Sequence, residues 1–166
     1  MFDPEDNSYE YFGGTIGPEL LECLSHQGLK TQIVGQAELL PCLVARIIWA
    51  QRTEGRAVIH YVDNEAARYA LIKVTSPTMD SAFLTAAFWK EDSNRKTFSW
   101  FERVPSPSNP ADAPSRKRKP EPLCQGTPNQ IEPRQILIPS GLESDLAWTW
   151  AQHFGNESFE IPEKGS

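Results

Sequence analysis

The chain has 166 residues, of which 39% are hydrophobic, including five Trp and eight Phe, so it holds enough apolar material for one domain with a core. The formal net charge of −6 excludes a protein that binds nucleic acid through a generally basic surface, and any such contact depends on a local patch. The acidic N-terminal segment has no signal-like apolar run, and the longest apolar stretch, LLPCLVARIIWA, is interrupted by Arg46, which predicts an intracellular protein with no membrane partner.

The N-terminal segment predicts a hairpin and then a short helix. FDPEDNSYEYFGG reads as two strands joined by a turn, because Pro4, Asp6 and Asn7 are turn residues. In GPELLECLSHQG, Pro18 suits the first position of a helix and Gly28 the position just past its end.

A second helix is predicted from about Ala37, after an extended piece at residues 32–34. Its apolar residues recur at helical spacing: Leu40, Leu43, Val44, Ile47 and Ile48. Pro41 fits such a helix only in the first turn, where its missing N–H is no loss. We therefore expect Glu38 at the N-terminal end of the helix and Gly55 at its close.

The next segments alternate between strand and helix. RAVIHYVDN predicts a strand that is buried on both faces and ends at Asp63, with His60 packed and hydrogen-bonded. NEAARYALIKVTS and MDSAFLTAAFWKE predict helices, the second with Asp80 or Ser81 as its N-cap, and TFSWFERV predicts a strand. The order strand–helix–strand–helix–helix–strand after residue 30 predicts an α/β domain with parallel strands.

The C-terminal part of the sequence predicts a linker and tail. Residues 105–135 are polar and rich in proline. GLESDLAWTWAQHFG predicts a short amphipathic helix at 142–153, which either docks back on the domain or binds a partner. We therefore expect a domain over residues 1–116 and a Pro-rich linker and tail over 117–166.

Three acids stand at the ends of predicted elements: Glu38 opens a helix, Asp63 ends a strand, and Asp112 follows the turn PSPSNP. Sites in open α/β sheets gather at strand ends and the neighbouring helix termini. Carboxylates there bind hard cations such as Mg²⁺, and paired ions support phosphodiester cleavage. Taken singly, each acid also has a purely structural interpretation as a helix-dipole, turn or capping residue.

The stretches VGQAELLPCLVA, IHYVDNEAARYALI and FERVPSPSNPADAPSR, in this order, resemble the ribonuclease H-like domain of retroelement (reverse transcriptase) polyproteins. The resemblance covers about residues 9–116 and implies a mixed sheet flanked by helices. It also implies that Glu38, Asp63 and Asp112 are catalytic ligands of two Mg²⁺ (or Mn²⁺) ions that cleave the RNA strand of an RNA–DNA hybrid. A reverse transcriptase, attached or separate, would be a partner.

Two departures from this family pattern lead us to expect weak or no nuclease activity. The family's first strand, with its catalytic Asp, lies upstream of the hairpin that begins here at Met1, so the domain is expected to be N-terminally truncated. Asp3 and Asp6 lie in the predicted turn and do not replace that residue. Pro114 closely follows Asp112, which predicts a last helix that is short or starts late.

A basic run, SRKRK, and one strand-end amide are the predicted nucleic-acid contacts: Asn64, Arg116, Lys117 and Arg118. The same run is also typical of a nuclear localisation signal or of a solvated linker face.

Two other interpretations of the whole chain stay open beside the nuclease. One is a non-catalytic interaction module that keeps the fold, favoured by the acidic charge and by Trp148 and Trp150 in the tail. The other is a decayed remnant without function.

Overall fold

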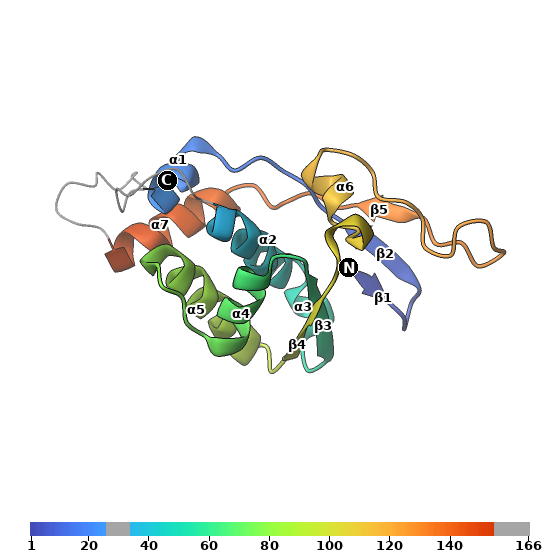
Figure 1. Cartoon of the computed structure of the whole chain (residues 1–166), viewed down its shortest axis with the longest axis horizontal. Coiled ribbons are helices and arrows are strands. Elements are labelled where there is room, and N and C mark those ends of the chain that lie inside the picture. Colours follow the sequence, from blue (N-terminus) through green and yellow to red (C-terminus); the bar gives the residue numbers. More distant parts are fainter. Residues whose placement is uncertain (26–33, 155–166) are drawn as a thin grey trace. The chain divides into compact units, whose positions relative to one another are not determined.

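This computed structural model describes residues 1–25 and 34–154, which form a mixed α/β fold (Figure 1). The chain divides into two compact units: unit 1 holds Met1–Thr15 and Val104–Pro139, and unit 2 holds Ile16–Arg103 and Ser140–Ser166. Each unit joins segments that are distant in the sequence. The predicted boundary between residues 116 and 117 therefore does not coincide with a division between the units.

Unit 1 is built on a small mixed sheet. Strands β1 (Phe2–Asp3) and β2 (Ser8–Tyr11) form the predicted antiparallel hairpin, and β5 (Pro133–Gln135) pairs with β2 in parallel. A short 3-10 helix η1 (Ser106–Ser108) and the helix α6 (Asp112–Ser115) complete the unit.

The segment that was predicted as a linker contains part of this sheet, so that prediction is wrong for β5. Proline is tolerated as the first residue of a strand, and Pro133 holds this place with its side chain buried. The next residue, Arg134, pairs with the Glu10 carboxylate on the neighbouring strand. Upstream, Leu123 and Ile131 form an antiparallel bridge, in which the backbone N–H of each residue donates to the carbonyl oxygen of the other. The contact of Arg134 with Glu10 joins residues 124 positions apart in the sequence, which local composition does not reveal.

Unit 2 places helices beside two parallel strands. The helices are α1 (Pro18–Ser25), α2 (Val34–Ile48), α3 (Ala50–Thr53), α4 (Glu65–Lys73), α5 (Met79–Asn94) and α7 (Leu142–Phe154). The strands β3 (Ala57–Val62) and β4 (Phe98–Arg103) pair in register, from Ala57 opposite Phe98 to Val62 opposite Arg103. The predicted order of elements from β3 to β4 is confirmed. Gly28 and residues 32–33 lie outside the described residues, and Val34 begins α2 rather than ending a strand.

The core of unit 2 lies where α2, α4 and α5 meet. Its most buried side chains include Leu43, Leu71 and Phe88. Phe88 contacts the aromatic rings on the strands: its centroid lies 5.3 Å from that of His60 and 5.6 Å from that of Phe101. The predicted packed, hydrogen-bonded His60 is confirmed, because its Nε2 lies 3.0 Å from Ser99 Oγ and its ring stacks on Phe101.

Helix α2 begins earlier than predicted, so Glu38 lies inside the helix and not at its N-terminal end. The prediction failed because it placed Pro41 in the first turn, whereas Pro41 lies within the helix. An interior proline costs about 3 kcal/mol or more. Here it is exposed, while its neighbours Leu39, Leu40 and Leu43 are buried, and this packing offsets the lost hydrogen bond.

Strand β3 is buried on one face only, which corrects the prediction of two buried faces. Ile59 and Tyr61 are 55% and 60% exposed, and Phe98 and Trp100 on β4 are 67% and 54% exposed. The register places these four side chains on one side of the pair, which we call the outer face. The other side packs on the helices. High β-branched content alone therefore did not distinguish a half-buried strand from a central one.

Helix ends are capped by local polar groups. Asn64 caps α4 by accepting a hydrogen bond from the Ala67 N–H at 2.9 Å, and Thr78 caps α5 by accepting from the Ser81 N–H at 3.4 Å. The predicted caps, Asp80 and Ser81, are instead the second and third residues of α5, which begins at Met79. Thr78 is the cap because it is the last residue with an extended backbone before the helix. The single helix that was predicted to close at Gly55 is two helices, since α2 ends at Ile48 and α3 ends at Thr53. Gly55, with φ of 71°, follows the second.

Helix α7 confirms both the predicted helix and its docking on the domain, because it lies beside α1 (Figure 1). Leu146 and Ala147 are buried, the Glu143 carboxylate accepts a hydrogen bond from the Gly17 N–H at 2.9 Å, and Cys23 Sγ lies 3.9 Å from the Ala147 carbonyl oxygen. Over residues 1–25 and 34–154, no helix combines the length and apolar character needed to cross a membrane.

Candidate functional site

Two of the three predicted acids come together in unit 2. Glu38 lies on α2, and Asp63 directly follows the last residue of β3; both are half-buried. Burial raises the pKa of the Glu38 carboxyl, and the negative charge of Asp63 raises it further. The negative charge of Asp63 therefore acts on the Glu38 carboxyl.

The local chain explains why Asp63 occupies this position. Val62 is buried at the end of β3, and Asn64 caps the next helix, so the single residue between them lies at the carboxyl end of a parallel strand. Helix α2 contacts α4, the helix that Asn64 caps. The acid pair thus depends on the packing of two helices around one strand end.

Cys42 lies next to the acid pair. Its Sγ is 3.5 Å from the Glu38 backbone oxygen, one helical turn away. Burial, followed by the charges of Glu38 and Asp63, raises the pKa of the Cys42 thiol to about 12. Without a cation at the acid pair, the thiol therefore stays protonated at neutral pH.

Two half-buried carboxylates suit a hard divalent cation, because their oxygens are the ligands that Mg²⁺ and Mn²⁺ prefer and because a cation relieves their repulsion. Glu38 and Asp63 would hold such an ion. Within either unit, over residues 1–25 and 34–154, three or more His, Cys, Asp or Glu side chains are nowhere grouped in a way that could hold a metal.

Asp112 belongs to unit 1 and begins α6 there. Arg116 Nε donates to Asp112 Oδ1 at 3.0 Å, and Arg118 lies 3.9 Å from Oδ2. The predicted short last helix is confirmed, since α6 spans only Asp112–Ser115 and buries Pro114. The carboxylate of Asp112 is therefore neutralised by two residues of the basic run.

The predicted nucleic-acid contacts have local structural roles. Asn64 is the cap of α4, while Arg116 and Arg118 pair with Asp112. Lys117 is exposed, with a φ of 58°. Their contact with nucleic acid stays a prediction, and for the two arginines it would require exchanging a carboxylate for a phosphate.

Sequence reasoning missed a buried polar network under the strands of unit 2. Arg46 Nε lies 3.1 Å from Asp92 Oδ1, and both side chains are almost fully buried. The Arg46 guanidinium also donates to the hydroxyl oxygens of Thr53 and Thr97. A charged residue inside the apolar helix pattern LLPCLVARIIWA was the signal that could have revealed it.

The network continues through Ser99 to His60. Ser99 Oγ donates to Asp92 Oδ1 at 2.7 Å and lies 3.0 Å from His60 Nε2. Serine stands between the acid and the imidazole, whereas a nucleophilic triad requires the imidazole between the acid and the serine. We therefore assign these residues to the stability of the fold rather than to catalysis.

Comparison of the chain with protein-family models, with curated proteins and with solved structures finds no match.

Proposed function

We propose that this chain is a ribonuclease H-like domain of retroelement origin, whose remaining acids bind a divalent cation and whose nuclease activity is weak. The observation that carries the proposal is the pairing of Glu38 with Asp63 in unit 2, from two separate elements. Two further features support it: the parallel pairing of β3 with β4, and the position of Asp112 at the start of α6 after the Pro-rich turn.

The acid pair has the chemistry expected of a cation site. A bound Mg²⁺ or Mn²⁺ supplies a polarised water and stabilises negative charge on a phosphoryl oxygen. In the absence of a cation, the raised pKa means that the Glu38 carboxyl takes up a proton more readily than an ordinary glutamate does. The charge of Asp63 is the source of part of this effect on Glu38.

The proposal is tested first by cation binding, watched at the carboxyl groups by NMR. Titration with Mg²⁺ is expected to shift the side-chain carboxyl signals of Glu38 and Asp63 together, and Mn²⁺ is expected to broaden both. Replacing Asp63 by Asn is expected to lower the pKa of Glu38 towards its ordinary value, because one of its two causes is removed.

The variant Glu38→Gln is expected to abolish the cation effect at Asp63. Glu65→Gln is the matched control, since Glu65 follows closely in the sequence but is paired with Arg68 at 2.9 Å. Carboxyl signals that do not respond to either cation, or that respond equally in Glu38→Gln, would contradict the proposal.

A cleavage assay on an RNA–DNA hybrid tests the second half of the proposal. Weak or undetectable cleavage is expected, because among the described residues of unit 2 no third acid joins Glu38 and Asp63 in a metal-holding group. Robust cleavage that Glu38→Gln and Asp63→Asn abolish would overturn the expected impairment while supporting the site itself.

A second function, an interaction module, is favoured by one observation. Four large apolar side chains, Ile59, Tyr61, Phe98 and Trp100, are each more than half exposed on the outer face of the strands. Exposed apolar groups that lie together mark surfaces that bind other molecules.

A further inference from the structure

We propose that the free edge of β4 is a binding site for an extended acidic peptide, which adds as a strand and inserts one large apolar side chain into the adjacent cavity. The proposal is independent of the cation site, since none of its residues is Glu38 or Asp63.

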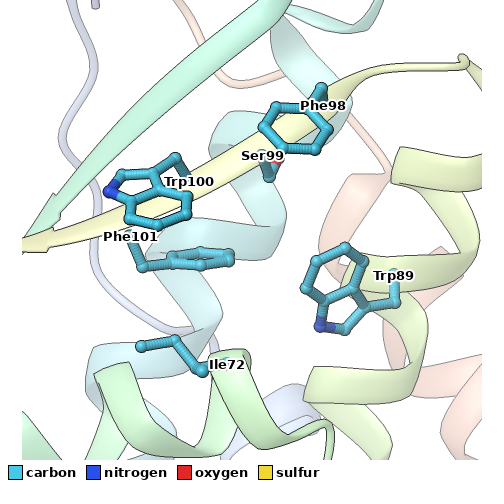
Figure 2. A pocket seen from close by; sticks show the side chains of 6 residues that line it. All are labelled: Ile72, Trp89, Phe98, Ser99, Trp100 and Phe101. Carbon is cyan, nitrogen blue, oxygen red and sulfur yellow. The ribbon is translucent and has the colours of Figure 1, made fainter.

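A cavity of about 250 Å³ lies beside β4 (Figure 2). Its lining comes from α4, α5 and β4: Ile72, Trp89, Phe98, Ser99, Trp100 and Phe101. Side chains from both sides of β4 line it, and no residue of β3 does, so the cavity lies along the outer edge of β4 rather than over the strand pair.

At the same edge, the main chain of β4 presents groups with no backbone partner among residues 1–25 and 34–154. Phe98 N–H donates to the Arg56 carbonyl oxygen on the β3 side. In a parallel ladder, successive residues of a strand direct their backbone groups alternately towards one neighbour and away from it. Phe98, Trp100 and Glu102 therefore direct their N–H and C=O groups towards β3. Those of Ser99, Phe101 and Arg103 therefore point outward, away from β3. A row of unpaired donors and acceptors is a template for another strand.

The cavity wall is held in place before anything binds. The Trp89 indole N–H donates to the Leu71 carbonyl oxygen at 2.8 Å, which fixes the ring against the end of α4. Its ring centroid lies 5.9 Å from that of Phe101 and 5.8 Å from that of Phe88. A preformed apolar wall reduces the entropy that a ligand side chain must lose on binding.

The size of the cavity favours a peptide side chain over a free small molecule. Sites for small molecules measure about 300 to 1,000 Å³ and carry several convergent polar groups. This cavity is smaller, and Ser99 supplies its one hydroxyl, which already donates to Asp92. The main-chain groups at its rim match an extended peptide backbone.

The basic residues that neighbour the lining in the sequence favour an acidic peptide. Lys73 directly follows Ile72, Lys90 directly follows Trp89, and Lys96 lies two residues before Phe98; all three are exposed. The acid nearest on β4 is Glu102, whose carboxylate accepts from the Trp100 indole N–H at 2.8 Å on the outer face. Three exposed lysines next to lining residues in the sequence complement carboxylates that flank an apolar residue.

The test uses a fluorescein-labelled peptide of sequence Asp-Glu-Val-Thr-Phe-Thr-Val-Glu-Asp, followed by fluorescence anisotropy with the full chain. Binding is expected, with the affinity reduced at least about tenfold when the peptide Phe is changed to Ala or the chain carries Ile72→Asp. Ile59→Asp is the matched control: Ile59 is the same residue type, similarly exposed, and outside the cavity. It is expected to leave binding within about twofold.

Amide hydrogen exchange provides a readout that does not depend on any variant folding. Peptide binding is expected to protect the amides of Ser99, Phe101 and Arg103. The proposal would be overturned if the peptide does not bind, or if Ile59→Asp weakens peptide binding as much as Ile72→Asp does. It would also be overturned if the peptide protects the amides of β3 instead of those of β4. Binding of a second copy of the chain or of oligothymidylate at this edge, with the same dependence on Ile72, would overturn it as well.

Discussion

A buried ion pair of unit 2 and an exposed ion pair of unit 1 differ in their access to solvent. In unit 2, Arg46 and Asp92 form a pair whose side chains are 1% and 4% exposed. In unit 1, the Lys119 and Glu132 side chains of one ion pair are 56% and 58% exposed. Buried charges lose their hydration and depend on each other, whereas exposed charges return to water when a partner is removed. The buried pair of unit 2 is therefore expected to contribute far more to stability than an exposed pair such as Lys119 with Glu132 in unit 1.

The largest effect is expected for Asp92→Ala. It leaves the buried Arg46 guanidinium without its carboxylate and removes the acceptor of Ser99, so we expect a loss of about 3–5 kcal/mol in the free energy of unfolding. Urea unfolding followed by circular dichroism measures it. The double variant Arg46→Met with Asp92→Leu is expected to lose less, because no unpaired charge is left. A loss below about 1 kcal/mol for Asp92→Ala would show that the pair behaves like a surface pair.

An intermediate effect is expected from pH through His60. Burial, and then the charge of Arg46, lowers the pKa of His60 from 6.5 to about 4, so the folded state keeps this imidazole neutral. The contribution of the neutral imidazole to the free energy of unfolding is present above pH 6.5 and is lost as the pH falls towards 4. The reason is that His60 of the unfolded chain binds a proton at a higher pH than His60 of the folded chain does. The variant His60→Gln is expected to flatten the dependence of the unfolding free energy on pH in this window.

Ser99→Ala is the control for the His60 experiment, since it removes the hydrogen bond but keeps the imidazole between Phe88 and Phe101. The pH dependence is expected to persist in this variant. If the unfolding free energy of His60→Gln depends on pH as that of the unchanged chain does, the loss of stability below pH 6.5 comes from other groups.

The smallest effect is expected for Lys119→Ala in unit 1. Its Nζ lies 2.9 Å from Glu132 Oε2, and both side chains are more than half exposed. We expect a change of less than about 0.5 kcal/mol in the free energy of unfolding, by the same urea measurement. A loss comparable to that of Asp92→Ala would remove the contrast between the units.

The helices and strands of unit 2 were largely predictable, since they follow from apolar periodicity and capping chemistry. The segments AVIHYV and FSWFER form strands, and the residues after Asn64 form a helix, as expected. The start of α2 was not predictable, because the cost of Pro41 is offset by packing of Leu40 and Leu43 in the core. In unit 1, β5 was missed because its partner β2 lies more than a hundred residues away in the sequence, which local patterns do not encode.

The candidate site was predictable only in part. The sequence named Glu38 and Asp63, and the structure places them near enough for the charge of Asp63 to raise the pKa of Glu38. It did not indicate that Arg116 and Arg118 pair with Asp112, because a basic run looks the same whether it faces solvent or a carboxylate. Nor did it indicate the cavity beside β4, whose lining residues come from three separate elements.

The docking of α7 on α1 has a consequence for synthesis on the ribosome. The Glu143 carboxylate that accepts from the Gly17 N–H is made 126 residues after its partner, which at about 5–20 residues per second is a delay of about 6–25 s. Throughout this interval Leu20, Cys23 and Leu24 lack the helix that later packs beside them. The nascent chain therefore carries an uncovered apolar stripe until its last helix emerges, and during that time chaperones have access to it.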